Sequence, residues 1–211
     1  MTAEQLALWY FRLNGFFTIN SFIIHPLRKG SARTDADIVG IRFPHRQELS
    51  KDNDVDMPEF TRASGKSYFV IAEVKTSVCQ LNGPWSDPTK ENIQALLGDL
   101  GPFETSKIDI VAKSIYEHGA FEDSSFYCSL FFLGSETNSD LEKTYPGIPQ
   151  HTWNQVLQFI FERFSTYKSR KMDHSSWDDT GKFLWNTWEG TNLNEFIEKI
   201  RKEIGLPESK N

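Results

Sequence analysis

Hydrophobic residues near the start of the chain recur with the spacing of a helix face. Four large apolar residues follow the i, i+3, i+4, i+7 pattern, which predicts an amphipathic helix: Leu6, Trp9, Tyr10 and Leu13. Thr2 and Gln5 have the spacing of a capping box at its beginning. Gly15 is suited to its end, because glycine readily adopts the left-handed conformation that terminates helices.

Four segments have the composition of β-strands. Aromatic and β-branched residues dominate 16–25, 34–43 and 68–76, which predicts three consecutive strands. The run FYCSLFFL at 126–133 is apolar on both alternating faces and predicts a buried strand. Segment 44–65 is polar and lacks periodicity, so it is expected to form a long exposed loop.

The remaining apolar stripes predict helices. One helix is expected after Asp87 and Pro88 as N-cap and first position, and a second around 108–115. After Gly134 the pattern is helical only, with stripes in 153–164, 183–188 and 193–204. The expected order is αβββααβ followed by helices, which predicts an α/β fold. A division into a core at 1–145 and a helical extension at 146–211, packed on that core, follows from this change of pattern.

Composition restricts the classes of protein to consider. The chain has 211 residues, of which 38% are hydrophobic and 25% charged, as in an ordinary globular domain. No apolar run approaches the roughly 18 residues of a membrane span, so no membrane association is expected. The two cysteines lack metal-site spacing and suggest reduced thiols in a cytoplasmic protein. A net charge of −6 argues against a protein that coats nucleic acid nonspecifically.

The strand at 68–76 carries two charges where a buried strand should be apolar. Glu73 and Lys75 are two residues apart, so their side chains share one face and lie roughly 7 Å apart along the strand. Asp37 also lies beside an apolar run, on the strand before. A salt-bridged pair at a strand end is the commoner explanation of an isolated Glu-x-Lys. Carboxylates on two neighbouring strands, however, are also suited to binding Mg²⁺, which prefers oxygen ligands.

These residues resemble the signature of the PD-(D/E)xK nuclease superfamily. The matching stretches are TDADIVG, with Asp37, and IAEVKTS, with Glu73 and Lys75. The leading helix with Glu4, its end at Gly15 and the strand that follows are most similar to the Holliday-junction-resolvase and Mrr-like branch, whose members often carry an additional acid on this helix. The resemblance covers about 1–134 and implies a restriction-endonuclease-like αβββαβ core, in which helices flank a central mixed sheet. Ala36 stands where the family's proline would be, and the interval between Asp37 and Glu73 is long.

The resemblance implies a nuclease that depends on Mg²⁺ or Mn²⁺ and acts on nucleic acid, with DNA preferred to RNA. In that interpretation Asp37, Glu73 and the Val74 carbonyl bind the metal, Lys75 positions the attacking water, and Glu4 contributes as an additional acid. Asp35 is an alternative to Asp37, because both have the same parity on the strand. The competing hypothesis is a catalytically silent nuclease-like fold that binds nucleic acid or protein within a larger complex.

Other residues are candidates for contacts with the substrate. Basic residues flank the strand that carries Asp37 and are suited to phosphate contacts, although they also suit a solvated edge: Arg28, Lys29, Arg33, Arg42 and Arg46. Trp85, in QLNGPWSDP, is a candidate for stacking on a base, against the commoner alternative of packing beneath a loop. Gln94 is expected on the next helix, where related nucleases can place a polar residue facing the site. The acidic run around Asp52, Asp54 and Asp56 lacks the glycine of a calcium loop and is expected to be solvated.

The apolar face of 153–164 is too wide for a helix on a surface, and Phe159 extends it. Two arrangements are consistent with this width. Either Phe159–Phe164 contact a second copy or a partner protein, or one continuous core buries the whole helix.

Overall fold

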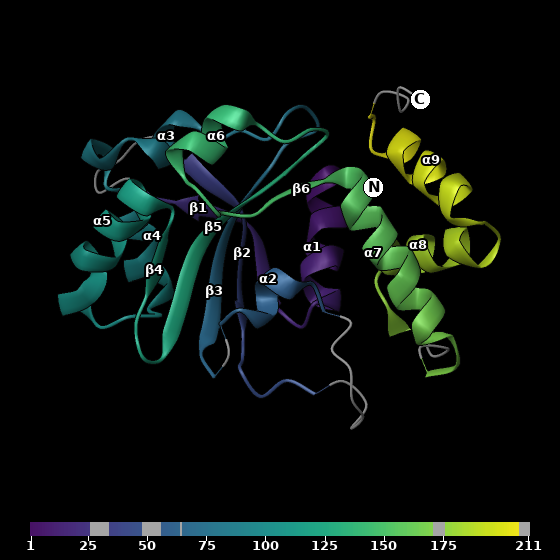
Figure 1. Cartoon of the computed structure of the whole chain (residues 1–211), viewed down its shortest axis with the longest axis horizontal. Helices are drawn as coiled ribbons and strands as arrows, with labels where there is room; N and C mark the ends of the chain where they lie inside the picture. The colour runs from purple at the N-terminus through teal and green to yellow at the C-terminus, as the bar shows by residue number, and fades with distance from the viewer. Residues whose placement is uncertain (26–33, 48–55, 64, 171–175, 207–211) are drawn as a thin grey trace.

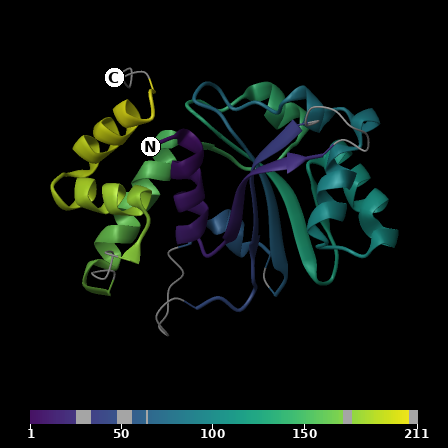
Figure 2. The ribbon, with the colours of Figure 1, turned by 180° about the vertical axis from the view of Figure 1, so that it is seen from behind.

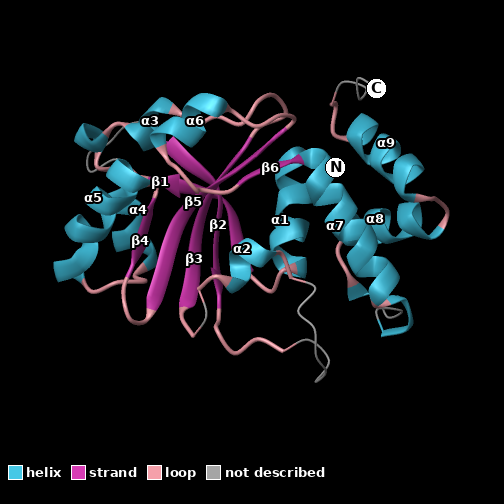
Figure 3. Ribbon diagram, in the orientation of Figure 1, coloured by secondary structure: helices cyan, strands magenta, loops and turns pink. Residues whose placement is uncertain are grey.

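A six-stranded mixed sheet forms the centre of the protein (Figure 3). The computed structural model describes residues 1–25, 34–47, 56–63, 65–170 and 176–206. The strands have these bounds: β1 Phe17–Ile24, β2 Thr34–Arg42, β3 Ser67–Val74, β4 Ala120–Glu122, β5 Phe126–Gly134 and β6 Gln150–Thr152. The four long strands are those expected from composition.

The sheet has the strand order β1-β2-β3-β5-β4, and β6 also pairs with β5. The pairs β1–β2, β2–β3 and β4–β5 are antiparallel, whereas β3–β5 and β5–β6 are parallel. The parallel pair β3–β5 needs a long crossover connection, which the helices between these strands supply. The mixed sheet flanked by helices confirms the expected α/β class.

Helices cover both faces of the sheet (Figures 1 and 2). One layer contains α1 Ala3–Leu13, α7 Trp153–Thr166, α8 Asp179–Glu189 and α9 Leu193–Glu203. The other contains α4 Asn92–Leu100 and α5 Ile108–His118. Shorter helices lie in the connections: α2 Pro58–Thr61, α3 Gly83–Ser86 and α6 Ser139–Thr144. Within these bounds, no helix has the length and apolarity that crossing a bilayer requires.

Helix starts follow local sequence in most cases. The capping boxes of Thr2 with Gln5 and of Thr152 with Gln155 are both present. The prediction of Asp87 as the N-cap of α4 is wrong. Asp87 caps a 3₁₀ turn at Pro88–Lys90 instead, and α4 begins after Glu91, whose φ of 53° lies in the left-handed region.

Two hydrophobic cores lie on the two faces of the sheet. The first joins α1 and the C-terminal helices to residues of β3 such as Val70, Ala72 and Val74. The second joins α4 and α5 to Phe69 and Ile71, the alternating residues of the same strand. Because side chains of a strand alternate between faces, Glu73 belongs to the α4–α5 side of β3.

The C-terminal helices complete the first core. Phe159 is 6% exposed and Phe164 is 0% exposed, and the half-buried Phe161 ring contacts Trp188 and Phe196. The prediction that Phe159–Phe164 contact a partner is therefore wrong, since α1, α8 and α9 cover this face within the chain. The segment after residue 145, expected to be a purely helical extension, also contributes to the sheet, because β6 pairs with β5.

Candidate active site

The candidate site lies where β2 and β3 separate. The β2–β3 ladder ends at the pair Ile38 and Ala72, and one further step in that register places Asp37 opposite Glu73. Beyond the ladder, the N–H of Val74 donates a 2.7 Å hydrogen bond to Oδ2 of Asp37. The Asp37 carboxylate therefore accepts from a backbone group that would otherwise lose its partner at the strand end.

The strand β1 is also irregular at this point. Its pairing with β2 passes from Asn20–Ile38 to Phe22–Ala36, and omits the intervening pair of Ser21 and Asp37. Ser21 has a φ of 50°, which is uncommon for a residue other than glycine. Strained backbone of this kind is concentrated at functional sites, so the irregularity marks Asp37 independently of its charge.

Lys75 joins the two carboxylates into one group. It directly follows β3, and its Nζ lies 2.6 Å from Oε2 of Glu73 and 3.5 Å from Oδ2 of Asp37. The structure thus brings together the three residues that the sequence singled out. Glu73 is buried, whereas the side chains of Asp37 and Lys75 are 19% and 20% exposed. Solvent therefore reaches this group through the side chains of Asp37 and Lys75.

Burial controls the protonation of this group. Loss of hydration raises the pKa of Glu73 to about 7, although the hydrogen bond and charge of Lys75 act in the opposite direction. Burial would lower the pKa of Lys75, but its hydrogen bond to Glu73 and the negative charges of Glu73 and Asp37 raise it instead. The lysine is therefore a cation at neutral pH, and the glutamate titrates near neutrality.

The raised pKa of Glu73 predicts a specific dependence of stability on pH. Between pH 4.5 and about 7 the folded protein binds more protons at this residue than the unfolded chain, so the stability that Glu73 contributes falls as pH rises. Glu73→Gln removes this contribution. Urea unfolding from pH 5 to 8 is expected to show a smaller loss of stability with rising pH in Glu73→Gln than in the wild type. Parallel curves for the two proteins would contradict the assignment.

Glu4 makes no hydrogen bond or ion pair with this group among the described residues. It lies in the first turn of α1, which covers the face of the sheet opposite to Glu73. Within the described ranges, no three side chains of His, Cys, Asp or Glu are arranged to hold a metal ion. The role of Glu4 as an additional acid stays a prediction.

Trp85 packs and does not stack on a ligand. It is 1% exposed, and its Nε1 donates a 3.1 Å hydrogen bond to the carbonyl of Asp35. The prediction of base stacking is wrong, because both ring faces are enclosed in the second core. The side chain of Asp35 is exposed beside the site. Gln94 lies half-buried on α4, where its Oε1 has no hydrogen-bond partner among the described residues, and its role stays a prediction.

Two of the five basic candidates belong to a buried ion-pair cluster. The Asp56 side chain is 0% exposed and accepts from Nη2 of Arg42 at 2.8 Å, from Nη1 of Arg46 at 2.7 Å and from Nη2 of Arg163. Arg42 also donates to the carbonyls of Asn14 and Phe60. The predictions of phosphate contacts for Arg42 and Arg46 are therefore wrong, as is that of a solvated Asp56. Residues outside the described part of the chain are Arg28, Lys29, Arg33, Asp52 and Asp54.

A second group of ionisable residues lies in the first core. Nε2 of His151 in β6 contacts Oε1 of Glu59 in α2, and its Nδ1 lies 2.9 Å from the hydroxyl of Tyr10. Burial raises the pKa of Glu59, but the hydrogen bond and charge of His151 outweigh it and the pKa is lowered. Burial raises the pKa of Tyr10 well above its ordinary value. The group ties α1, α2 and β6 together.

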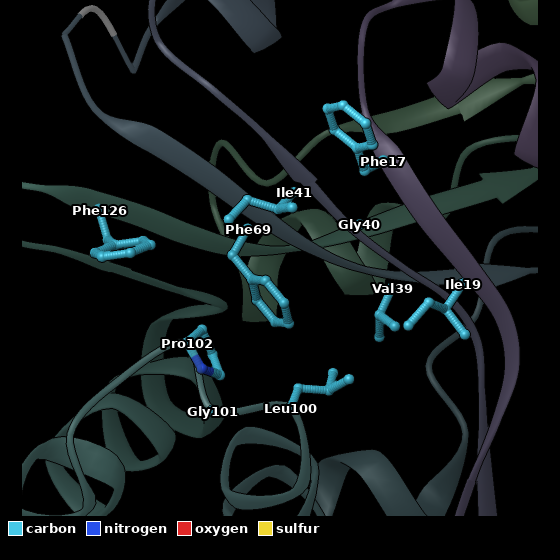
Figure 4. A pocket seen from close by; sticks show the side chains of 10 residues that line it. All are labelled: Phe17, Ile19, Val39, Gly40, Ile41, Phe69, Leu100, Gly101, Pro102 and Phe126. Carbon is cyan, nitrogen blue, oxygen red and sulfur yellow. The ribbon is translucent and has the colours of Figure 1, made fainter.

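An apolar pocket of about 380 Å³ lies on the α4–α5 side of the sheet, between strands β1–β3 and the end of α4. Its lining side chains surround a common space (Figure 4) and carry no ionisable group: Phe17, Ile19, Val39, Gly40, Ile41, Phe69, Leu100, Gly101, Pro102 and Phe126. Asp37, Glu73 and Lys75 are not among them, so the pocket supplies no acid, base or metal ligand.

Comparison of the sequence with protein-family models and with curated proteins, and of the fold with solved structures, gives no match.

Proposed function

We propose that this protein is a metal-dependent nuclease that hydrolyses phosphodiester bonds, with DNA as the preferred substrate. The observation that carries the proposal is the meeting of two carboxylates and one ammonium group at the end of β3, where Lys75 Nζ lies within 3.5 Å of both Asp37 and Glu73. Acids on two adjacent strands and a lysine two residues after the second acid are the elements of the PD-(D/E)xK signature.

The sheet supports a restriction-endonuclease-like core. In the proposed correspondence, α1, β1, β2, β3, the helices α4 and α5, and β5 supply the αβββαβ unit. The antiparallel pairs β1–β2 and β2–β3 and the parallel pair β3–β5 suit this unit. In this assignment β4 and β6 are additions that share the outer edge of β5.

The donor groups fit Mg²⁺ or Mn²⁺. Magnesium is commonly bound through one or two carboxylates together with substrate phosphates and several waters, so Asp37 and Glu73 suffice, with the Val74 carbonyl as a third candidate. Burial raises the pKa of the Glu73 carboxylate to about 7 even beside Lys75, so a further positive charge nearby would favour its ionised form. A bound divalent cation supplies Lewis-acid stabilisation of the phosphate and lowers the pKa of water.

Lys75 has the central role among the residues of the chain itself. Its ammonium group can orient the attacking water and donate a hydrogen bond to a phosphate oxygen on which negative charge develops. Its raised pKa keeps it a donor at neutral pH. Lysine acts here as a compact charge on a flexible stem, so its usefulness depends on how firmly the protein positions it.

One observation favours the competing hypothesis of a silent fold that binds nucleic acid or protein. Lys75 is already paired with both carboxylates, and Asp37 already accepts from the Val74 N–H, as in a group that only stabilises the strand end. Metal binding separates the two hypotheses, since a structural ion pair does not need a cation.

Asp37→Asn is expected to abolish Mn²⁺ binding measured by titration calorimetry, because it removes one of two carboxylate ligands. Asp109→Asn is the matched control: the same change at an exposed side chain in the first turn of α5, which takes part in no described ion pair, should retain wild-type binding. Absence of binding by the wild type at millimolar Mn²⁺, or equal binding by both variants, would contradict the proposed site.

A further inference from the structure

The main chain of Lys75 is held on both sides by hydrogen bonds. Its N–H donates to the carbonyl of Leu133 in β5 at 2.9 Å. Its carbonyl accepts from Nε1 of Trp153 at 2.9 Å. Trp153 is 0% exposed and is the first residue of α7, whose entry is fixed by the capping box of Thr152 and Gln155. A residue of the C-terminal helical layer therefore reaches the backbone of the candidate site.

The segment after Lys75 is fastened as well. Ser135 N–H donates to the carbonyl of Ser77 at 2.7 Å, and Cys79 N–H donates to the carbonyl of Glu136 at 2.8 Å. Gly134 permits this approach, because a Cβ there would lie 2.7 Å from both the Cys79 nitrogen and the Ser77 oxygen. The chain on either side of the Lys75 carbonyl thus has little freedom to shift, and Trp153 is the side chain that holds this carbonyl itself.

We propose that Trp153 is a positioning residue, which holds the Lys75 backbone so that the ammonium group stays between Glu73 and Asp37. The expected effect on the cleavage rate rests on the proposed nuclease function. The expected effect on the position of the Lys75 ammonium group does not. The side chain of lysine has four rotatable methylene groups, so a fixed Cα limits where Nζ can lie in addition to its ion pairs with Glu73 and Asp37. A displacement of about 1 Å at a reacting group can lower a rate by as much as about 100-fold.

Trp153→Phe removes the indole N–H and keeps an aromatic ring. We expect kcat for DNA cleavage to fall roughly tenfold with KM little changed, because Lys75 is misplaced while substrate binding is unaffected. Trp188→Phe is the matched control: Trp188 lies in the same helical layer, is 7% exposed, and donates from Nε1 to Ser165 Oγ at 3.1 Å, away from Lys75. This control should keep the wild-type kcat. Equal kcat for wild type and Trp153→Phe would overturn the inference.

A second measurement needs no catalysis. Competitive acetylation with acetic anhydride, read by mass spectrometry, reports the reactivity of Lys75 relative to Lys66, whose Nζ is paired with Glu122 at 2.6 Å. The ratio should rise several-fold in Trp153→Phe and stay at the wild-type value in Trp188→Phe. An unchanged ratio in Trp153→Phe would overturn the inference.

The two measurements separate the proposed function from the positioning role of Trp153. If the wild type cleaves no nucleic acid, the proposed function is wrong, and the acetylation ratio alone decides whether Trp153 positions Lys75. If Trp153→Phe does not fold, replacement of Trp153 by benzothienylalanine, which keeps the shape of the ring system but lacks the N–H, takes its place. A raised ratio in that variant supports the inference, and an unchanged ratio overturns it.

Discussion

Asp56→Asn is expected to lower the free energy of unfolding by about 3–5 kcal/mol, because it leaves buried guanidinium groups without the carboxylate that compensates them. The Asp56 side chain is 0% exposed, and those of Arg42 and Arg163 are 9% and 1% exposed. The cluster also joins the loop before α2 to β2 and to α7, so its loss weakens contacts between separate parts of the chain.

Urea unfolding at pH 7 measures this effect. Asp140→Asn is the matched control, since Asp140 pairs with Lys143 at 2.9 Å on the surface and both side chains are largely exposed. An exposed pair contributes about 1 kcal/mol or less, so the control should unfold close to the wild type. A similarly small loss in both variants would contradict the role given to the Asp56 cluster.

Lys75→Met is expected to lower the single-turnover rate of DNA cleavage by roughly 10²–10³-fold, the loss typical of removing one donor to a developing negative charge. Methionine keeps an unbranched stem but carries no ammonium group. The fold should persist, because Glu73, with a pKa near 7, can take up a proton when its partner is removed. Lys66→Met is the control: Lys66 directly precedes β3 at the opposite end of the strand and pairs with Glu122. Equal losses in both variants would contradict the assignment.

The sequence predicts those features of the fold that depend on local patterns. The face of α1 and the capping boxes of α1 and α7 are encoded within a few residues, and each is present in the structure. The strands β4 and β6 have three residues each, too few to show a period, and their positions are set by pairing with β5. Such elements depend on the rest of the sheet, so composition gave no signal for them.

Part of the candidate site was predictable because it also depends on local patterns. Strand alternation places Glu73 on one face of β3, and the antiparallel pairing of β2 with β3 brings Asp37 beside it. The environments of Trp85 and Arg42 depend instead on distant contacts. Trp85 donates to the Asp35 carbonyl, and Arg42 donates to Asp56, which also binds Arg163, 107 residues further along the chain. No local pattern in the acidic run of the sequence predicts that Asp56 is buried.

The most direct test of the proposed function is a cleavage panel over duplex, flap, junction and single-stranded DNAs and the corresponding RNAs. Wild type and Glu73→Gln are incubated with each labelled substrate in Mn²⁺ and in excess EDTA. The account predicts that the wild type cleaves at least one DNA in Mn²⁺, that EDTA stops cleavage, and that Glu73→Gln is inactive while remaining folded. Equal cleavage by wild type and Glu73→Gln, or no cleavage of any substrate by the wild type, would contradict it.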